Sequence, residues 1–208
     1  MEWLLDSADV KDWKRVSPTG LFSAVTTNPL LIQRAGLHCS IDTYKALLDQ
    51  AMDLGFDHLQ LQVFGDDWEA MAEQILSISD NTLVKIPANE RGFVLATQLA
   101  VPERTTITGV YSVHLGAAAE RLGAAYAAPY YARLAESNRD VDAIFTGLRA
   151  ACQNTKILVA SLRSIDQFEH LVTLGHRCFT IPGALLNDLL SDEMTEAAIA
   201  QFEEAAKS

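Results

Sequence analysis

Short apolar runs alternate with longer segments of helical periodicity along the whole chain. Short runs bounded by turn residues are typical of strands, whereas apolar positions spaced three and four apart indicate amphipathic helices. Capping residues precede the helical segments, for example Ser40 with Asp42, Asn89 with Glu90 and Ser164 with Asp166. The pattern predicts strands at residues 3–6, 22–27, 58–63, 82–87, 104–110, 124–129, 156–161 and 177–182, and a final helix from about 191 to 206.

Regular alternation of strands and helices predicts an α/β protein with a parallel sheet covered by helices. Closure of the sheet leaves no exposed edge, so we expect a (β/α)8 TIM barrel with an additional C-terminal helix, forming a single domain over residues 1–208. A doubly wound open sheet is the rival architecture. It is weakened because no GxGxxG follows a strand, and no GxxxxGK[ST] phosphate loop is present.

Composition narrows the classes of partner and site. A net charge of −11 argues against nucleic acid or an anionic membrane surface as the general partner. Three widely separated cysteines form no CxxC pair, and with no signal peptide or long apolar span in the sequence they favour a cytoplasmic location. The histidines have no HxH or HExxH spacing, so we expect no metal site and structural or surface roles for His38, His58, His114, His170 and His176.

Polar residues stand where the predicted strands end. In a (β/α)8 barrel the carboxyl ends of the strands form the active-site face, so these residues should converge there. They are Asp6, Thr26, Thr27, Asn28, Gln62, Lys85, Thr108, Tyr130, Arg133, Ser161 and Arg163.

Lys85 is unusual because it lies inside the apolar run TLVKIP. One reading is that its side chain reaches solvent or pairs with an acid across the barrel. The other is that burial lowers its pKa, so that the neutral amine attacks a carbonyl group. Lys156, at the start of its strand, should lie on the opposite rim in solvent.

Taken in order, these residues resemble the transaldolase family, and within it the fructose-6-phosphate aldolase subgroup. The matching segments are LLDSADV, AVTTNPLLI, LQLQV, LVKIP, AAPYYAR and VASLR. The resemblance implies a class I aldolase with Lys85 as the Schiff-base nucleophile and neither a metal nor an organic cofactor. It also implies that Asp6 and Asn28 hold the donor hydroxyls, with Thr26 and Thr27 supporting that end.

The same resemblance assigns the remaining residues. Gln62, Thr108 and Tyr130 would hold the water that transfers protons, while Arg133, Ser161 and Arg163 would bind the substrate phosphate. The expected reaction is cleavage or formation of the C3–C4 bond of a ketose phosphate, with dihydroxyacetone or hydroxyacetone as donor and an aldehyde like glyceraldehyde 3-phosphate as acceptor.

Two alternatives stay open. Transaldolases of the family, which transfer a dihydroxyacetone unit between sugar phosphates of the pentose phosphate pathway, typically carry glutamate and phenylalanine where this chain has Gln62 and Tyr130, so an aldolase is favoured. A sugar-phosphate binding protein without catalysis is the other alternative. The resemblance also implies a homo-oligomer, a pentamer or decamer, although the C-terminal helix ends at Ser208, short of the tail through which those aldolases assemble.

Overall fold

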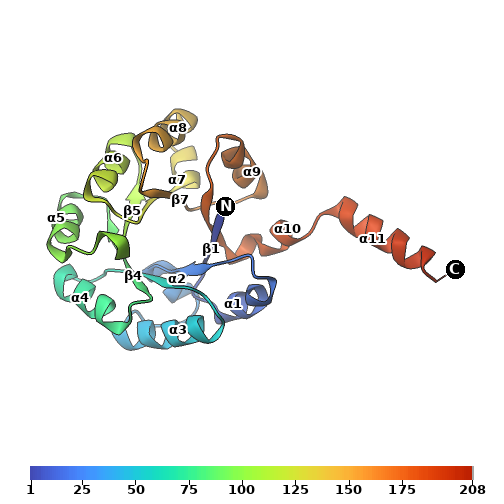
Figure 1. Cartoon of the computed structure of the whole chain (residues 1–208), viewed down its shortest axis with the longest axis horizontal. Coiled ribbons are helices and arrows are strands. Elements are labelled where there is room, and N and C mark those ends of the chain that lie inside the picture. The colour runs from blue at the N-terminus through green and yellow to red at the C-terminus, as the bar shows by residue number, and fades with distance from the viewer. Residues whose placement is uncertain (208) are drawn as a thin grey trace.

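The strands form a closed parallel barrel in the computed structural model, which describes residues 1–207 (Figure 1). Each strand pairs with the next along the chain, and the last pairs with the first, which confirms the (β/α)8 prediction. The strands are β1 (Glu2–Asp6), β2 (Ala24–Thr26), β3 (Leu59–Gln62), β4 (Thr82–Pro87), β5 (Thr105–Val110), β6 (Tyr126–Pro129), β7 (Lys156–Val159) and β8 (Cys178–Pro182).

Helices surround the barrel, and most of them begin at capping side chains that satisfy free backbone N–H groups. Asp9, Ser40, Asp67, Asn89, Asp140 and Ser164 each accept such a bond. The helices are α1 (Val10–Val16), α2 (Pro29–Arg34), α3 (Ile41–Asp53), α4 (Trp68–Ile78), α5 (Glu90–Leu99), α6 (Val113–Leu122), α7 (Tyr131–Ala135), α8 (Val141–Ala151), α9 (Ile165–Thr173), α10 (Leu186–Leu190) and α11 (Glu193–Ala205), with short 3₁₀ turns at Ser17–Thr19, Pro102–Arg104 and Gly183–Leu185.

Three short helices, α2, α7 and α10, were not predicted, because five or six residues are too few to display helical periodicity. Of these, α2 and α7 follow β2 and β6 and so lie at the carboxyl end of the barrel. Asn28 caps α2 by accepting from the backbone N–H groups of Leu30 and Leu31, and Pro29 occupies the first helical position. The segments that follow β2 and β6 therefore form short helices at this end of the barrel.

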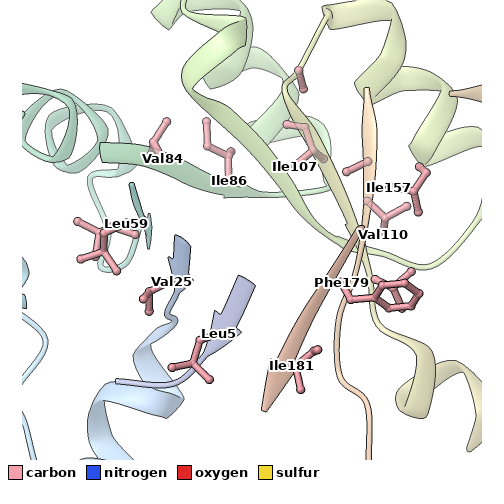
Figure 2. Close-up of a cluster of buried hydrophobic side chains, with 14 of the residues drawn as sticks. Leu5, Val25, Leu59, Val84, Ile86, Ile107, Val110, Ile157, Phe179 and Ile181 are labelled. Carbon is pink, nitrogen blue, oxygen red and sulfur yellow. The ribbon is translucent and has the colours of Figure 1, made fainter. Parts of the chain in front are cut away.

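Alternate residues of each strand face opposite sides of the barrel wall. The outward apolar side chains pack against the helices in one large core, which includes Leu5, Val25, Val84, Ile107 and Phe179 (Figure 2). A smaller apolar cluster, with Leu4, Ala24, Leu83, Tyr126, Ala128, Leu158 and Cys178, forms a separate group. Because Val84 and Ile86 belong to the outer core, Lys85 between them faces the interior.

Close packing of α5 fixes the position of β4. A Cβ atom added at Gly92 would lie 2.0 Å from the carbonyl oxygen of Pro87, so only glycine permits this approach. Since Pro87 lies two residues after Lys85, the contact supports the strand that carries the lysine.

The C-terminal segment leaves the barrel, and α11 extends away from it in Figure 1. None of its residues is buried, and Met194, Ile199 and Phe202 are 83%, 48% and 71% exposed. The predicted additional helix is present and begins two residues later than expected, since Asp192 caps it.

Candidate active site

A cavity of about 490 Å³ opens at the carboxyl ends of the strands. Its wall includes the predicted residues Asp6, Asn28, Gln62, Lys85, Tyr130, Arg133, Ser161 and Arg163. The other three, Thr26, Thr27 and Thr108, are buried and contact this group from the barrel wall. The structure therefore brings the predicted residues together around one cavity.

The Lys85 amine is buried, with only 4% of the residue exposed. Its Nζ donates a hydrogen bond of 2.9 Å to the carbonyl oxygen of Thr27. Burial lowers its pKa, and the Asp6 carboxylate opposes this shift by electrostatic attraction. No carboxylate of residues 1–207 forms an ion pair with Lys85, so the charge of its buried ammonium is only partly compensated.

Asp6 is held on the side of the cavity formed by β1 and β2. Thr26 Oγ1 donates to Asp6 Oδ1 at 2.8 Å and also lies 2.6 Å from Thr180 Oγ1. Burial raises the pKa of Asp6, while Lys85, the Thr26 hydroxyl and Arg34 counteract the rise. The Asn28 side-chain oxygen is occupied by capping, which leaves its amide NH2 group as a donor.

Tyr130 and Thr108 form a hydroxyl pair on the β5–β6 side. Their oxygens are 2.9 Å apart, and either can donate. Tyr111 contacts the Tyr130 ring edge to face, and the Arg133 guanidinium lies 5.1 Å from the ring centroid of Tyr130. Burial raises the pKa of Tyr130, so its hydroxyl keeps its proton and can donate to a water or substrate oxygen.

The loop after β7 supplies a hydroxyl and a guanidinium. Ser161 has φ of 62°, a left-handed conformation that is uncommon outside glycine. The Arg163 guanidinium is ion-paired with Glu136, and both side chains are more than half exposed. Arg163 therefore lies in the wall of the cavity, as predicted, and its charge is already paired with that of Glu136.

Three contributors were not predicted from the sequence: Arg34, Glu136 and Thr180. Arg34 and Glu136 lie at the ends of the unpredicted helices α2 and α7, beyond the strand ends that guided the prediction. Thr180 lies within β8, where no candidate had been named. Its alternation with the outward residues Phe179 and Ile181 was the available signal.

The opposite rim lacks these features. Lys156 is exposed there and forms an ion pair of 2.7 Å with Glu2, as its position at the strand start predicted. His176 is buried against Phe145, and His58 contacts Gln60.

Across residues 1–207, no group of three or more His, Cys, Asp or Glu side chains could hold a metal ion. Among the described helices, none combines the length and apolar character needed to cross a bilayer.

A (β/α)8 barrel with a buried lysine among polar strand-end residues fits an enzyme of the aldolase or transaldolase type, and the family match shows this class. The profile of the family "Transaldolase/Fructose-6-phosphate aldolase" matches residues 3–208, and the chain belongs to this family. This confirms the resemblance drawn from the motifs.

Two individual relatives support the same assignment, and a solved structure shares the fold. A "Probable transaldolase" of Streptococcus agalactiae is 28% identical, over 97% of this chain and 95% of its own. A "Probable transaldolase 2" of Listeria monocytogenes is 29% identical, over 97% of this chain and 94% of its own. A HpcH/Hpal aldolase/citrate lyase family protein from Burkholderia cenocepacia shares the fold, with a TM-score of 0.67 at 11% identity over 100% of this chain and 95% of its own.

We predict that Asp6→Asn lowers the pKa of Lys85 further. Removing the carboxylate removes the attraction that stabilises the ammonium, whereas burial of the amine remains. The rate of amine modification at Lys85, followed by mass spectrometry against pH, should show an inflection below the ordinary 10.5 in the wild type. In Asp6→Asn the inflection should move to lower pH.

The matched control is Glu73→Gln on the exposed part of α4, which should leave the inflection in place. A wild-type inflection at or above 10.5, or an upward move in Asp6→Asn, would contradict the electrostatic account.

Proposed function

We propose that this protein is a class I aldolase of the fructose-6-phosphate aldolase type. It breaks or forms the C3–C4 bond of a ketose phosphate, with dihydroxyacetone or hydroxyacetone as donor and a glyceraldehyde 3-phosphate type of aldehyde as acceptor. The observation that carries the proposal is the buried Lys85 amine, with its lowered pKa, in the wall of the cavity.

The amine attacks the C2 ketone, and loss of water gives an imine. In cleavage, the C4 hydroxyl loses its proton, the C3–C4 bond breaks, and the electron pair moves into the imine to give an enamine as the aldehyde leaves. Protonation at C3 and hydrolysis by water then release the three-carbon ketone. The hydroxyl pair of Thr108 and Tyr130, with Gln62 in the wall of the same cavity, would hold a water that carries these protons.

Substrate binding is divided between two sides of the cavity. Asp6 and the free amide NH2 of Asn28 bind the donor hydroxyls, and Thr26 and Thr27 hold Asp6 and Lys85 in place. Arg133, Ser161 and Arg163 bind the phosphate of the other end, where the guanidinium groups offer charge-assisted hydrogen bonds in an acidic chain.

The covalent imine serves as the electron sink, so the proposed reaction uses neither a metal nor an organic cofactor.

The partner is a small sugar phosphate rather than nucleic acid or a membrane, in keeping with the net charge of −11. A cytoplasmic location fits Cys39, Cys152 and Cys178, which are free thiols in the described chain.

The second candidate is a transaldolase, which passes the three-carbon enamine to an aldose. The names of the Streptococcus and Listeria relatives favour this reading. We favour release of the free ketone because Gln62 and Tyr130 are the residues of the aldolase subgroup. The Tyr130 hydroxyl offers a proton donor that phenylalanine lacks.

We also propose that α11 packs against a second copy of this chain in a homo-oligomer. Met194, Ile199 and Phe202 are exposed on a helix that extends away from its own barrel, and burying them against another subunit would remove this apolar area from water.

Borohydride treatment in the presence of dihydroxyacetone should attach the three-carbon unit to Lys85, and peptide mass spectrometry locates the adduct. Lys85→Met keeps the side-chain length but removes the amine, so turnover should vanish while binding of inorganic phosphate persists. Lys156→Met is the matched control on the opposite rim and should retain turnover. An adduct at another residue, or turnover without Lys85, would refute the imine mechanism.

Tyr130→Phe should shift the enzyme from release towards transfer. Loss of the hydroxyl should slow formation of free ketone roughly 100-fold, as expected for removal of a positioned proton donor. Transfer to an added aldose phosphate should fall less, since the enamine then reacts with an aldehyde. Undiminished ketone release in Tyr130→Phe would show that this tyrosine does not divide the two activities.

Replacing Ile199 and Phe202 together by aspartate should lower the molecular mass in solution, measured by light scattering, without lowering the helix content of the barrel. The control replaces Glu196 and Glu203, exposed on the same helix, by glutamine. An unchanged mass in the aspartate variant would exclude α11 as the contact.

A further inference from the structure

Two hydrogen bonds in series connect Asp6 to the interior of the barrel. Thr26 Oγ1 donates to Asp6 Oδ1 at 2.8 Å, and the hydroxyl oxygens of Thr26 and Thr180 are 2.6 Å apart. The three residues come from β1, β2 and β8, and β1 pairs with both of the other strands. Thr26 and Thr180 are only 0% and 2% exposed, so bulk water does not compete for their hydroxyls.

The direction of the two bonds follows from the number of protons available. A hydroxyl has one proton to donate, and an ionised carboxylate can only accept. The Thr26 proton is therefore committed to Asp6, and the bond between the two threonines must be donated by Thr180. For an ionised Asp6 the series runs from Thr180 to Thr26 to the carboxylate.

Protonation of Asp6 makes this arrangement less favourable at either oxygen. A proton on Oδ1 would reverse both bonds, and the Thr180 hydroxyl, whose one hydrogen-bond partner among residues 1–207 is Thr26, would keep a buried proton without an acceptor. A proton on Oδ2 would leave the series intact but weaken it, because an ionised acceptor forms the stronger hydrogen bond. Both comparisons favour the carboxylate.

Thr180 itself lies away from the ligand. In the pairing of β1 with β8 it is the partner of Leu4, two residues before Asp6, which places it one layer deeper in the barrel. It is not part of the cavity wall, whereas Asp6 is. Within the described chain Asp6 Oδ2 has no hydrogen-bond partner, so this oxygen can accept from a ligand while Oδ1 is held by Thr26.

We propose that Thr180 is a positioning residue that acts through Thr26 to hold Asp6 as an oriented carboxylate for the hydroxyls of the donor. The proposal rests on the role of Asp6 in the proposed function and adds the residue that controls its charge. Thr180 does not touch the substrate, so its effect should appear in the protonation of Asp6.

Other groups also act on the Asp6 carboxyl. Burial raises its pKa, while the charges of Lys85 and Arg34 lower it, and Tyr130 is coupled to it electrostatically. Thr180 is uncharged and acts by hydrogen bonding alone. Thr180→Val therefore removes the hydroxyl while all of these charges remain.

The test follows the Asp6 carboxyl by NMR titration of protein labelled with ¹³C-aspartate, with the signal assigned from its loss in Asp6→Asn. In Thr180→Val the midpoint should move to higher pH, with a proton affinity roughly three to ten times greater, as expected for loss of one hydrogen bond. Thr180→Ser keeps the hydroxyl and should restore the wild-type midpoint. An unmoved midpoint in Thr180→Val, or an equal move in Thr180→Ser, would overturn the proposal.

The matched control is Thr105→Val on β5. Thr105 is also buried, but its hydroxyl donates to the carbonyl oxygen of Val101, so its removal should leave the midpoint of Asp6 in place. If circular dichroism shows that Thr180→Val does not fold, Thr180→Cys replaces it, because a thiol is a weak donor and should also raise the midpoint. A wild-type midpoint in Thr180→Cys then counts against the proposal.

The pH dependence of kcat/KM for cleavage gives a second readout. Activity should be lost on the acid side as Asp6 becomes protonated, so the acid limb should lie at higher pH in Thr180→Val than in the wild type. Where Asp6 is ionised in both proteins, the two rates should converge. A merely structural defect would lower kcat/KM at every pH and leave the acid limb unmoved, which would refute the role of Thr180.

The titration needs no turnover, so it separates this proposal from the proposed function. A raised midpoint in Thr180→Val supports the role of Thr180 even if borohydride traps no donor on Lys85. An unmoved midpoint overturns that role even if the aldolase activity is confirmed.

Discussion

Burial of the Lys85 amine is the constraint on which the candidate site depends. An ammonium inside a barrel is costly unless its charge is compensated, and here the hydrogen-bond partner is a neutral carbonyl, that of Thr27. Asp6 acts on the amine electrostatically without an ion pair. This arrangement leaves the lysine weakly compensated, which favours the neutral form that a nucleophile needs. Packing of Gly92 against Pro87 keeps the strand that carries it in place.

The polar residues on the two sides of Lys85 differ in chemistry. On the Asp6 side, threonine hydroxyls orient a carboxylate. On the opposite side, Tyr130 pairs with Thr108 and also supports the guanidinium of Arg133 through its ring. Tyr130 therefore contacts both Thr108 and Arg133, so the proposed proton-transfer and anion-binding regions share this side chain.

Much of this site could be predicted from the sequence, for a physical reason. Alternation of side chains along β4 places Lys85 opposite in direction to Val84 and Ile86, and parallel strands bring their carboxyl ends to one face. Those two rules locate the cavity wall without any knowledge of distances.

The remainder depends on tertiary contacts that local patterns do not encode. Thr180 meets Thr26 across 154 positions of sequence, and this contact exists only because β8 closes against β1. Arg34 and Glu136 lie at the ends of helices too short to predict by periodicity. The ion pair between Arg163 and Glu136 was therefore visible only in the folded chain.

The left-handed backbone at Ser161 has a consequence for how this site changes during evolution. A residue with φ of 62° is strained unless it is glycine or, to a lesser degree, asparagine. The two residues that suit this backbone best differ in chemistry, since one removes the side chain and the other replaces a hydroxyl with an amide. A lineage that replaces Ser161 by glycine or asparagine would therefore exchange the hydroxyl that lines the cavity at little cost to the barrel, so this part of the cavity wall can change while the fold persists.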